Sequence, residues 1–239
     1  MLRTHPRWIE NFLVKSQTEW NRVTKNALFT EIAERKLPVQ MVQFAVKNFY
    51  PLIESFPKYL ALMLSRIPSG GAKEVALARQ WLMENLHVEE RHAKWFIDLG
   101  VGFGLSRSIF SSPIRPPAQV DAINNYLWRV STQGSLAECF GAVNFAMEGP
   151  TGEWTKATRE GFKRYEGTKD TDFCAGTLAW IDAHAMYDDD HVEGALRLMA
   201  LFARTPAEQE KATAAAIRSL EYYAMAVEAC YLLSQHQTT

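Results

Sequence analysis

Two segments of the chain carry histidine and carboxylate residues at spacings that suit metal binding. In ENLHVEERHAKWF, Glu89 and His92 are three residues apart, so a helix would place both side chains on one face. An inward-facing Glu-x-x-His pair is the ligand unit of di-iron and di-manganese carboxylate bundles. Because many surface helices contain this spacing by chance, the pair alone also fits a solvent-exposed charged face.

The second segment is WIDAHAMYDDDHVEGALRLM. It contains His184, Asp188 and His191 at positions i, i+4 and i+7, which places the three side chains within about 60° of arc on one helix. Two imidazoles and a carboxylate on one stripe suit Fe, Mn or Zn. The alternative is a polar stripe at a helix junction, in which the aspartates at 188–190 cap a following helix.

A third carboxylate, Glu148, follows the strongly apolar segment CFGAVNFAM. Burying it unpaired would cost on the order of several kcal/mol, so we expect it to be neutral, to pair with a base or to bind metal. The alternative is an exposed glutamate in the last turn of a helix, a position that the helix dipole disfavours. Asn144, four residues earlier, could orient the Glu148 carboxylate.

These residues together offer three carboxylates and three imidazoles. Three negative charges brought together in a core need cations, and two divalent ions would leave a site charge of about +1. The charge count therefore favours two metal ions over one and a substrate that carries a carboxylate. The three cysteines lie far apart without a C-x-x-C pair, which excludes a disulfide framework and a thiolate zinc site. Oxygen and nitrogen ligands then point to iron or manganese.

The elements that must position these residues are helices. Hydrophobic spacing is helical nearly throughout, with neither an alternating strand pattern nor an internal repeat. The segment from Pro38 to about residue 67 contains Pro51 and Pro57, which should kink the helix rather than end it. A further helix is expected over about residues 72–99, ending at Gly100.

Two capping boxes mark the starts of later helices. One lies at 135–138 and the other at 205–208, the latter with a proline at the first helical position. The helix that carries Glu148 is expected to end at residues 149–150, and residues 106–117 are expected to be the one substantial loop. We therefore predict a single all-α domain over residues 1–239, a bundle of about seven to nine helices.

Composition and charge exclude several classes of protein. With 47% hydrophobic residues the chain is not intrinsically disordered, and with a formal net charge of −1 it lacks the basic surface that nucleic-acid binding needs. The N-terminal residues have no signal-peptide pattern, and no uncharged apolar run reaches about 18 residues. We expect a cytoplasmic protein without a membrane or nucleic-acid partner, and a homodimer as the default assembly.

The order of the three motifs resembles that of the heme oxygenase-like di-iron oxidases and oxygenases, in the superfamily that contains TenA thiaminases and the pyrroloquinoline-quinone-forming oxidase. The resemblance implies a heme oxygenase-like helical bundle that activates O₂ to oxidise a small substrate. It implies two non-heme iron ions, the second of them labile, with manganese as the other possible metal. By the same resemblance the metal ligands, which are also the catalytic residues, would be Glu89, His92, Glu148, His184, Asp188 and His191.

The Glu-x-x-His spacing is similar to that of the branch of this family that fragments fatty acids to terminal alkenes. The related chlamydial death-domain-associating branch, which makes p-aminobenzoate, places its first Glu and His seven residues apart and sacrifices a tyrosine of an early helix. Here Phe96 stands seven residues after Glu89, and the corresponding early segment, VTKNALFTEI, contains no tyrosine. This departure argues against p-aminobenzoate synthesis.

Two other functions stay open. Cys139, nine residues before Glu148, could be the nucleophile of a TenA-like hydrolase, or the chain could be a non-catalytic helical binding protein of the same fold. Glu54 could contact substrate, although a surface position suits it better. Four phenylalanines are expected to be core rather than cavity lining: Phe49, Phe56, Phe140 and Phe145. The sequence does not identify the substrate.

Overall fold

The computed structural model describes residues 5–236, except for the side chains of residues 187–190. Within this range the chain is helical and contains no strand, as the sequence predicts. The α-helices are α1 (Arg7–Thr24), α2 (Ala27–Ala33), α3 (Val39–Ser65), α4 (Lys73–Gly102), α5 (Ala118–Gln133), α6 (Leu136–Cys139), α7 (Gly149–Lys163), α8 (Ala179–Phe202) and α9 (Pro206–Gln235). A 3₁₀-helix, η1 (Arg107–Ser111), and a π-helix, η2 (Phe140–Glu148), complete the set.

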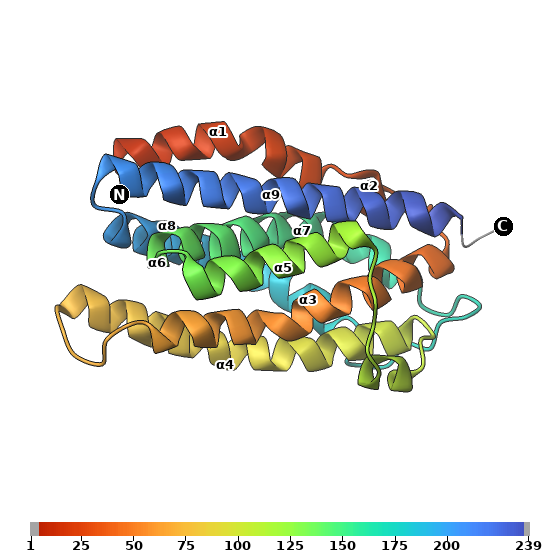
Figure 1. Cartoon of the computed structure of the whole chain (residues 1–239). Helices are drawn as coiled ribbons and strands as arrows, with labels where there is room; N and C mark the ends of the chain where they lie inside the picture. Colours follow the sequence, from red (N-terminus) through yellow and green to blue (C-terminus); the bar gives the residue numbers. More distant parts are fainter. Residues whose placement is uncertain (1–4, 237–239) are drawn as a thin grey trace.

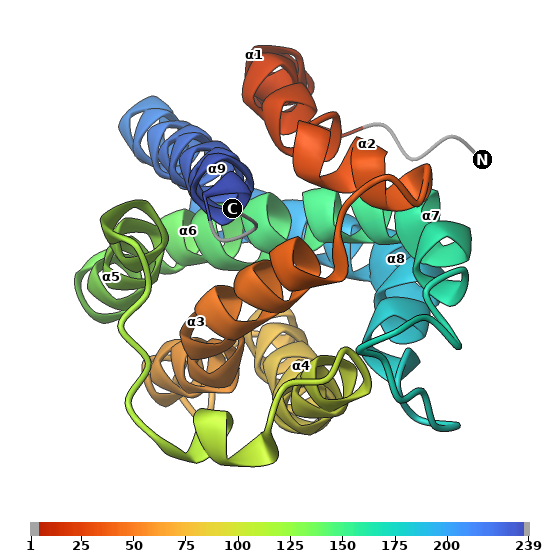
Figure 2. The same ribbon diagram turned by 90° about the vertical axis from the view of Figure 1, so that its right-hand side faces the viewer.

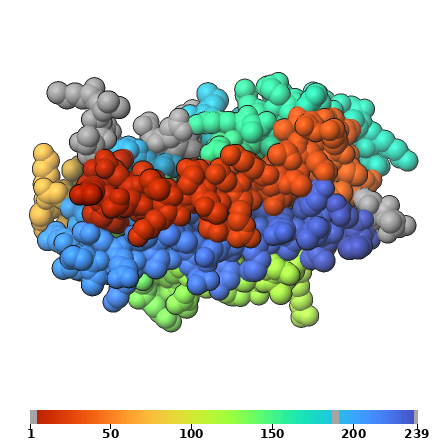
Figure 3. Space-filling model, turned by 90° about the horizontal axis from the view of Figure 1, so that it is seen from above, coloured from red at the N-terminus to blue at the C-terminus, as the bar shows by residue number. Residues whose placement is uncertain are grey.

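The continuous segment α6–η2–α7 crosses the middle of the bundle. Helices α1 and α9 lie on one side of it and the pair α3 and α4 lies on the other (Figures 1 and 2). In the space-filling view α1 and α9 run side by side over one face of the molecule (Figure 3). Because η2 packs against both α8 and α9, its side chains are buried along its whole length. Any polar residue on η2 therefore needs a partner inside the bundle.

Most of the expected helix signals are confirmed. Helix α3 continues through Pro51 and Pro57, and both capping boxes form, one with Ser135 and the other with Thr205 as the N-cap residue. The expected end of the helix at Gly100 is wrong, because α4 continues to Gly102. Gly102 allows close packing of α4 on Thr177, because a Cβ atom at this position would lie 2.2 Å from Cγ2 of Thr177.

The expected end of a helix at residues 149–150 is also wrong. The π-helix passes directly into α7, with Pro150 in the first turn of the α-helical part. The change from π-helical to α-helical hydrogen bonding at this point accommodates a residue that has no backbone N–H to donate. Gly149 is needed for packing, because a Cβ atom there would lie 2.2 Å from Cη2 of Trp20 on α1.

A second long connection was not expected. Residues 164–178 join α7 to α8 through turns, and Asp170 there has a positive φ of 72°. The N–H of Asp172 donates to the carbonyl oxygen of Gly102 at 2.8 Å, and the ring of Phe173 packs on Phe103, so the connection is attached to the end of α4. The expected loop at 106–117 is real but contains η1. Among the described helices, none is long and apolar enough to cross a membrane.

Candidate metal centre

Three of the side chains singled out by spacing meet between α4 and α8. Glu89, His92 and His184 are all buried, and each offers one ligand atom within 4.8 Å of the other two. Nδ1 of His92 lies 2.9 Å from Oε2 of Glu89, and the two imidazole rings lie 4.5 Å apart. Nδ1 of His184 donates to the carbonyl oxygen of Trp180 at 2.8 Å, which leaves Nε2 of His184 with the lone pair.

A second group lies on η2 and α8. Nδ1 of His191 lies 2.9 Å from Oε2 of Glu148, and Nδ2 of Asn144 donates to Oε1 of the same carboxylate at 2.6 Å. This hydrogen bond is the contact through which Asn144 could orient Glu148. Glu148 is buried rather than exposed, so the alternative of a solvent-facing glutamate is wrong.

The two groups belong to one electrostatic environment. Burial raises the pKa of Glu89 well above its ordinary value, and the nearby charge of Glu148 raises it further, while His191 lowers it. Burial lowers the pKa of His92 to about 4 and that of His184 well below its ordinary value. Both imidazoles are therefore neutral at pH 7, which is the protonation state of a metal ligand.

Five of the six predicted ligands come together in this way from α4, η2 and α8. The sixth, Asp188, lies on α8, but its side chain is outside the described residues. Helix α8 approaches α4 closely at Gly194, where a Cβ atom would lie 2.5 Å from Nε1 of Trp81. This approach puts His191, whose ring lies 6.3 Å from that of Trp81, near the carboxylates of the other two elements.

The donor set fits iron or manganese. Nε2 of His92 is buried and has no hydrogen-bond partner in the part of the chain that the structure describes. A buried imidazole nitrogen in that state is costly unless a proton donor or a metal ion uses its lone pair. Neutral imidazoles and carboxylates are the ligands that first-row divalent metals share, and the carboxylates offset the metal charge.

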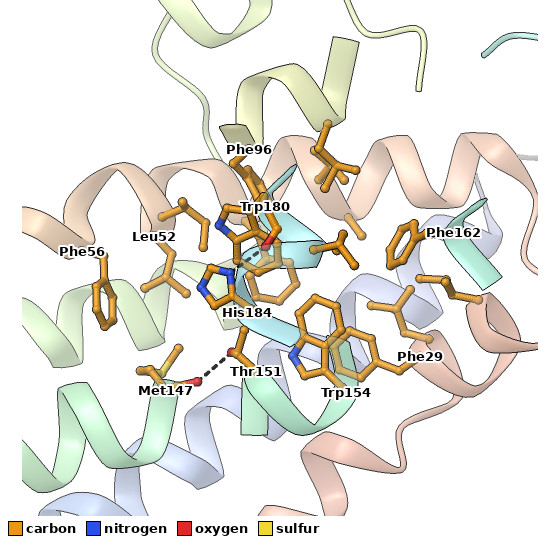
Figure 4. Close-up of a pocket in the computed structure, with 18 of the residues that line it drawn as sticks. Phe29, Leu52, Phe56, Phe96, Met147, Thr151, Trp154, Phe162, Trp180 and His184 are labelled. Atoms are coloured by element: carbon orange, nitrogen blue, oxygen red, sulfur yellow. Dashed lines mark hydrogen bonds between the residues drawn. The ribbon is translucent and has the colours of Figure 1, made fainter. Parts of the chain in front are cut away.

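An apolar cavity with a free volume of about 90 Å³ adjoins the centre (Figure 4). Glu89, Glu148 and His184 form its polar wall, and the rest of the lining is mostly aromatic and aliphatic. The cavity volume exceeds several-fold the space that one water needs. The aliphatic lining residues and the phenylalanines come mainly from α2, α3 and α4: Leu28, Phe29, Ile32, Val42, Ala45, Val46, Phe49, Leu52, Ile53, Phe56, Phe96, Leu99, Met147, Phe162 and Ile181.

A hydrogen-bonded chain runs along one wall of the cavity. Nε1 of Trp154 donates to the Tyr223 hydroxyl oxygen at 2.9 Å, and that hydroxyl lies 2.9 Å from Oγ1 of Thr151. Because the Thr151 hydroxyl donates to the carbonyl oxygen of Met147 at 2.7 Å, the Tyr223 hydroxyl must donate to Thr151. Sequence spacing gave no signal for Tyr223, which lies far from the motifs on α9.

Several other expectations concern the cavity. Phe49 and Phe56 line it, so the prediction of plain core is wrong for them, whereas Phe140 and Phe145 are buried in the core as expected. Glu54 forms an ion pair with Lys58 on the outer side of α3 and is not part of the lining. The aromatic residues at 49 and 56 differ from those at 140 and 145 only in tertiary position, which periodicity does not reveal.

Cys139 does not lie at the cavity. Its thiol is buried and donates to the carbonyl oxygen of Val130 at 3.2 Å, while Nη1 of Arg66 lies 3.6 Å from the sulfur. Burial raises the pKa of Cys139 to about 11, so the thiol form prevails at pH 7. The three cysteines are free, as the sequence predicts.

The chain is similar to known proteins in sequence and in structure. The family described as iron-containing redox enzymes matches residues 43–224. A 4-aminobenzoate synthase from Chlamydia pneumoniae is 32% identical over 102 residues, which are 43% of this chain. The matched part spans only 42% of the length of that curated relative.

The solved structures similar to this chain share its fold over nearly the whole length. A TenA homologue from Pseudomonas syringae superposes with a TM-score of 0.87 at 25% identity, covering 95% of this chain and 94% of the other. A heme oxygenase-like domain of unknown function from Shewanella denitrificans has a TM-score of 0.75 at 16% identity, covering 96% and 94%. A TenA homologue from Pyrococcus furiosus gives 0.75 at 16%, covering 94% and 100%. The expected heme oxygenase-like bundle is thus confirmed.

Proposed function

This chain belongs to the family of iron-containing redox enzymes, and on that premise we propose that it is a non-heme di-iron oxidase or oxygenase. The proposed ligands are Glu89, His92, Glu148, His184, Asp188 and His191. The proposed substrate is a small molecule that carries a carboxylate and is oxidised at the expense of O₂. Manganese remains the alternative metal.

The observation that carries the proposal is the unpaired ring nitrogen of His92. Its Nε2 atom is buried without a hydrogen-bond partner in the described part of the chain, while ligand atoms of Glu89 and His184 lie within 4.8 Å of the ligand atom of His92. A purely structural histidine in a core would pair both ring nitrogens. A divalent cation would use the free lone pair of Nε2 and compensate the buried carboxylates.

The residues of the chain have separate tasks in this proposal. The carbonyl oxygen of Trp180 holds the proton of His184 on Nδ1, so that Nε2 is available as a ligand. Asn144 and His191 hold the two oxygens of Glu148 in place. The apolar cavity excludes bulk water from the reacting atoms and accepts the body of the substrate. Iron(II), when bound, supplies the electrons for the reduction of O₂.

We propose that the substrate comes from solution and is not a side chain of the protein. The ring of Phe96, seven residues after Glu89, packs 5.0 Å from that of Trp180 and supplies no ligand atom. The early segment at 23–32 has no tyrosine to consume. The activity named for the chlamydial relative is therefore not the one proposed here.

Anaerobic titration with Fe²⁺ tests the proposal. Chelator-treated protein should bind two iron ions per chain, and exposure to O₂ should then consume O₂ faster when an aliphatic or aromatic carboxylic acid is present. Glu148→Ala should lose at least one ion, whereas Glu153→Ala, which changes an exposed glutamate on the following helix, should bind as the wild type does. Wild-type protein that binds no Fe²⁺, or that is equally stable with and without Glu148, would contradict the proposal.

A TenA-like hydrolase is the second candidate, and the similarity to the Pseudomonas syringae structure favours it. In that reading the cavity would hold a heterocyclic substrate and Cys139 would be the nucleophile. The buried thiol of Cys139 would first have to leave its hydrogen bond to Val130 and reach the cavity. Hydrolysis of a thiamine-derived pyrimidine that disappears in Cys139→Ala would favour this candidate over the oxidase.

A further inference from the structure

Trp180 lies where the metal centre meets the apolar cavity. Its indole is buried, with 3% of its surface exposed, and it contributes to the cavity wall. The ring centroid of this indole lies 4.0 Å from that of His184, 5.0 Å from that of Phe96 and 5.8 Å from that of Trp154 (Figure 4). The position of this indole is therefore defined by packing against three aromatic rings.

The indole N–H of Trp180 is a buried donor without an acceptor. Nε1 has no hydrogen-bond partner among the described residues. A buried tryptophan usually places its N–H on an acceptor, because leaving a donor unpaired in a core is costly. A hydrophobic core role alone would be filled at lower cost by a phenylalanine, which has no donor to satisfy.

The other donors of the described cavity lining are already used. Trp154 donates to Tyr223, and Tyr223 in turn donates to Thr151. The Thr151 hydroxyl donates to the carbonyl oxygen of Met147, and Nδ1 of His184 donates to that of Trp180. The carboxylates in the lining are acceptors when ionised. Within the described lining, the N–H of Trp180 is thus the nitrogen donor left for a bound molecule, beside the Glu89 carboxyl, whose raised pKa lets it keep a proton.

We propose that Trp180 orients the substrate by donating a hydrogen bond from its indole N–H to a carboxylate or carbonyl oxygen of that molecule. This inference rests on the proposed function, because it takes the occupant of the cavity to be the substrate. The bond holds the oxygen at the indole, whose ring centroid lies 4.0 Å from that of His184. The apolar body of the substrate then lies along the aliphatic and aromatic lining. An ammonium group, which has no lone pair to accept, is not held in this way.

In this proposal Trp180 contacts both the proposed metal ligand His184 and the substrate. Its backbone carbonyl holds the tautomer of His184, while its side chain holds the substrate oxygen. The carbonyl contact is retained in any substitution of the side chain, so replacing the indole changes the substrate contact and leaves the hydrogen bond to His184 in place. This separation makes the side-chain role measurable without altering the proposed ligands.

Indole resonances provide the test. Protein labelled with ¹⁵N-tryptophan gives one Nε1–H signal for each of the 7 tryptophans. The Trp180 signal is assigned from Trp180→Phe and, independently, from nuclear Overhauser contacts to Phe96. The probes are hexanoate, hexanamide and hexylamine, each added to iron-free protein and to protein loaded with redox-inactive Zn²⁺. We expect hexanoate and hexanamide to move the Trp180 proton downfield and hexylamine to leave it unchanged.

Calorimetric titration of the same probes gives the affinity. Trp180→Phe should bind hexanoate about tenfold more weakly than the wild type, the loss of one hydrogen bond to a charged acceptor. Trp128→Phe is the control, because it also shortens an indole, but one that packs on Tyr59 and is not part of the cavity lining. It should bind hexanoate within about twofold of the wild type.

The outcomes separate this inference from the proposed function. If neither hexanoate nor hexanamide moves the Trp180 signal, or if Trp180→Phe binds hexanoate as tightly as the wild type, the inference is overturned, whatever the iron titration gives. If the signal moves and the affinity falls while the protein binds no Fe²⁺, the oxygen-binding role of Trp180 stands and the di-iron oxidase is wrong. Because the wild-type spectrum carries the main readout, the test does not depend on the variant being folded.

Discussion

Nδ2 of Asn144 donates a 2.6 Å hydrogen bond to Oε1 of Glu148, and both residues lie on the π-helix η2. The second oxygen of the same carboxylate lies 2.9 Å from Nδ1 of His191 on α8. The carboxylate is thus held from its own element and from a neighbouring one. Because π-helical segments are rare and occur often at functional sites, the presence of η2 under this carboxylate supports a functional role for the centre.

Asn144→Ala should weaken Fe²⁺ binding by about 10- to 100-fold, the usual effect of removing a residue that orients a metal ligand. The reason is that Glu148 would lose the partner of Oε1 and gain rotational freedom. Asn48→Ala is the control, since Asn48 is also buried and donates its amide to a main-chain oxygen four residues earlier. Anaerobic titration should show a loss only for the first variant, and equal affinities would contradict a role of Asn144.

The stability of the metal-free protein should depend on pH through the titration of Glu89. Its pKa in the folded chain lies well above the ordinary value of 4.5, so the metal-free protein loses stability as pH rises above about 4.5 towards that raised pKa. Glu89→Gln should remove this loss and raise the melting temperature of chelator-treated protein at pH 7. Glu90→Gln, at an exposed position next to it, should change little. A Glu89→Gln variant that melts lower than the wild type at pH 7 would contradict the prediction.

His92 changes the stability of the metal-free protein with pH in the opposite direction to Glu89. Its pKa falls from 6.5 to about 4 on folding, so its contribution is complete above pH 6.5 and is lost as pH falls towards 4. In the Glu89→Gln variant this loss of stability at acid pH should remain, because protonation of the His92 imidazole causes it. Fe²⁺ should raise the melting temperature of the wild type at pH 7 more than that of the variant, because the carboxylate that offsets the metal charge is missing there.

The local part of the centre was predictable because helix geometry follows from spacing. Glu89 with His92, and His184 with His191, share a face at three- and seven-residue separations whatever surrounds them. The pairing of Glu148 with His191 needs the packing of η2 on α8, across 43 positions of the chain, and spacing gives no such information. The motif order suggested their proximity, but their hydrogen bond is a tertiary property.

Other features of the fold depend on tertiary packing that overrides local signals. Gly149 followed by Pro150 normally ends a helix, yet the close packing of Trp20 on Gly149 and the change from π- to α-helix carry the chain through. Gly100 stays helical for a similar reason, because a Cβ there would lie 2.5 Å from Cζ of Phe110. The 164–178 connection carries turn signals at Gly167 and Gly176, but its attachment to the end of α4 through Asp172 and Phe173 is a tertiary property.

Alkylation of the cysteines tests the hydrolase alternative. Cys174 is exposed and its pKa is lowered by the hydrogen bond from the Thr177 hydroxyl, whereas burial raises the pKa of Cys139 to about 11 and that of Cys230 to about 12. Iodoacetamide at pH 8 should therefore modify Cys174 first in the native protein and leave the two buried thiols intact. Mass spectrometry of tryptic peptides gives the order, and rapid labelling of Cys139 would favour an accessible nucleophile.

Tyr223→Phe should destabilise the protein more than a tyrosine with one partner would. Its hydroxyl accepts from Trp154 and donates to Thr151, so removal leaves the Trp154 N–H buried without an acceptor. We expect a loss of about 2–3 kcal/mol in the free energy of unfolding, against about 1 kcal/mol for Tyr126→Phe, whose buried hydroxyl donates to the carbonyl oxygen of Ala215. Urea denaturation monitored by circular dichroism measures both.

A double-mutant cycle tests whether this wall of the cavity acts as one hydrogen-bonded chain. Thr151→Val removes the acceptor of the Tyr223 hydroxyl while keeping the side-chain shape, and the double variant with Tyr223→Phe removes both ends of that bond. The two losses should be less than additive by about 0.5–3 kcal/mol, since the second substitution removes a bond that is already broken. Additive losses would mean that the two hydroxyls do not depend on each other and that this wall is not one hydrogen-bonded chain.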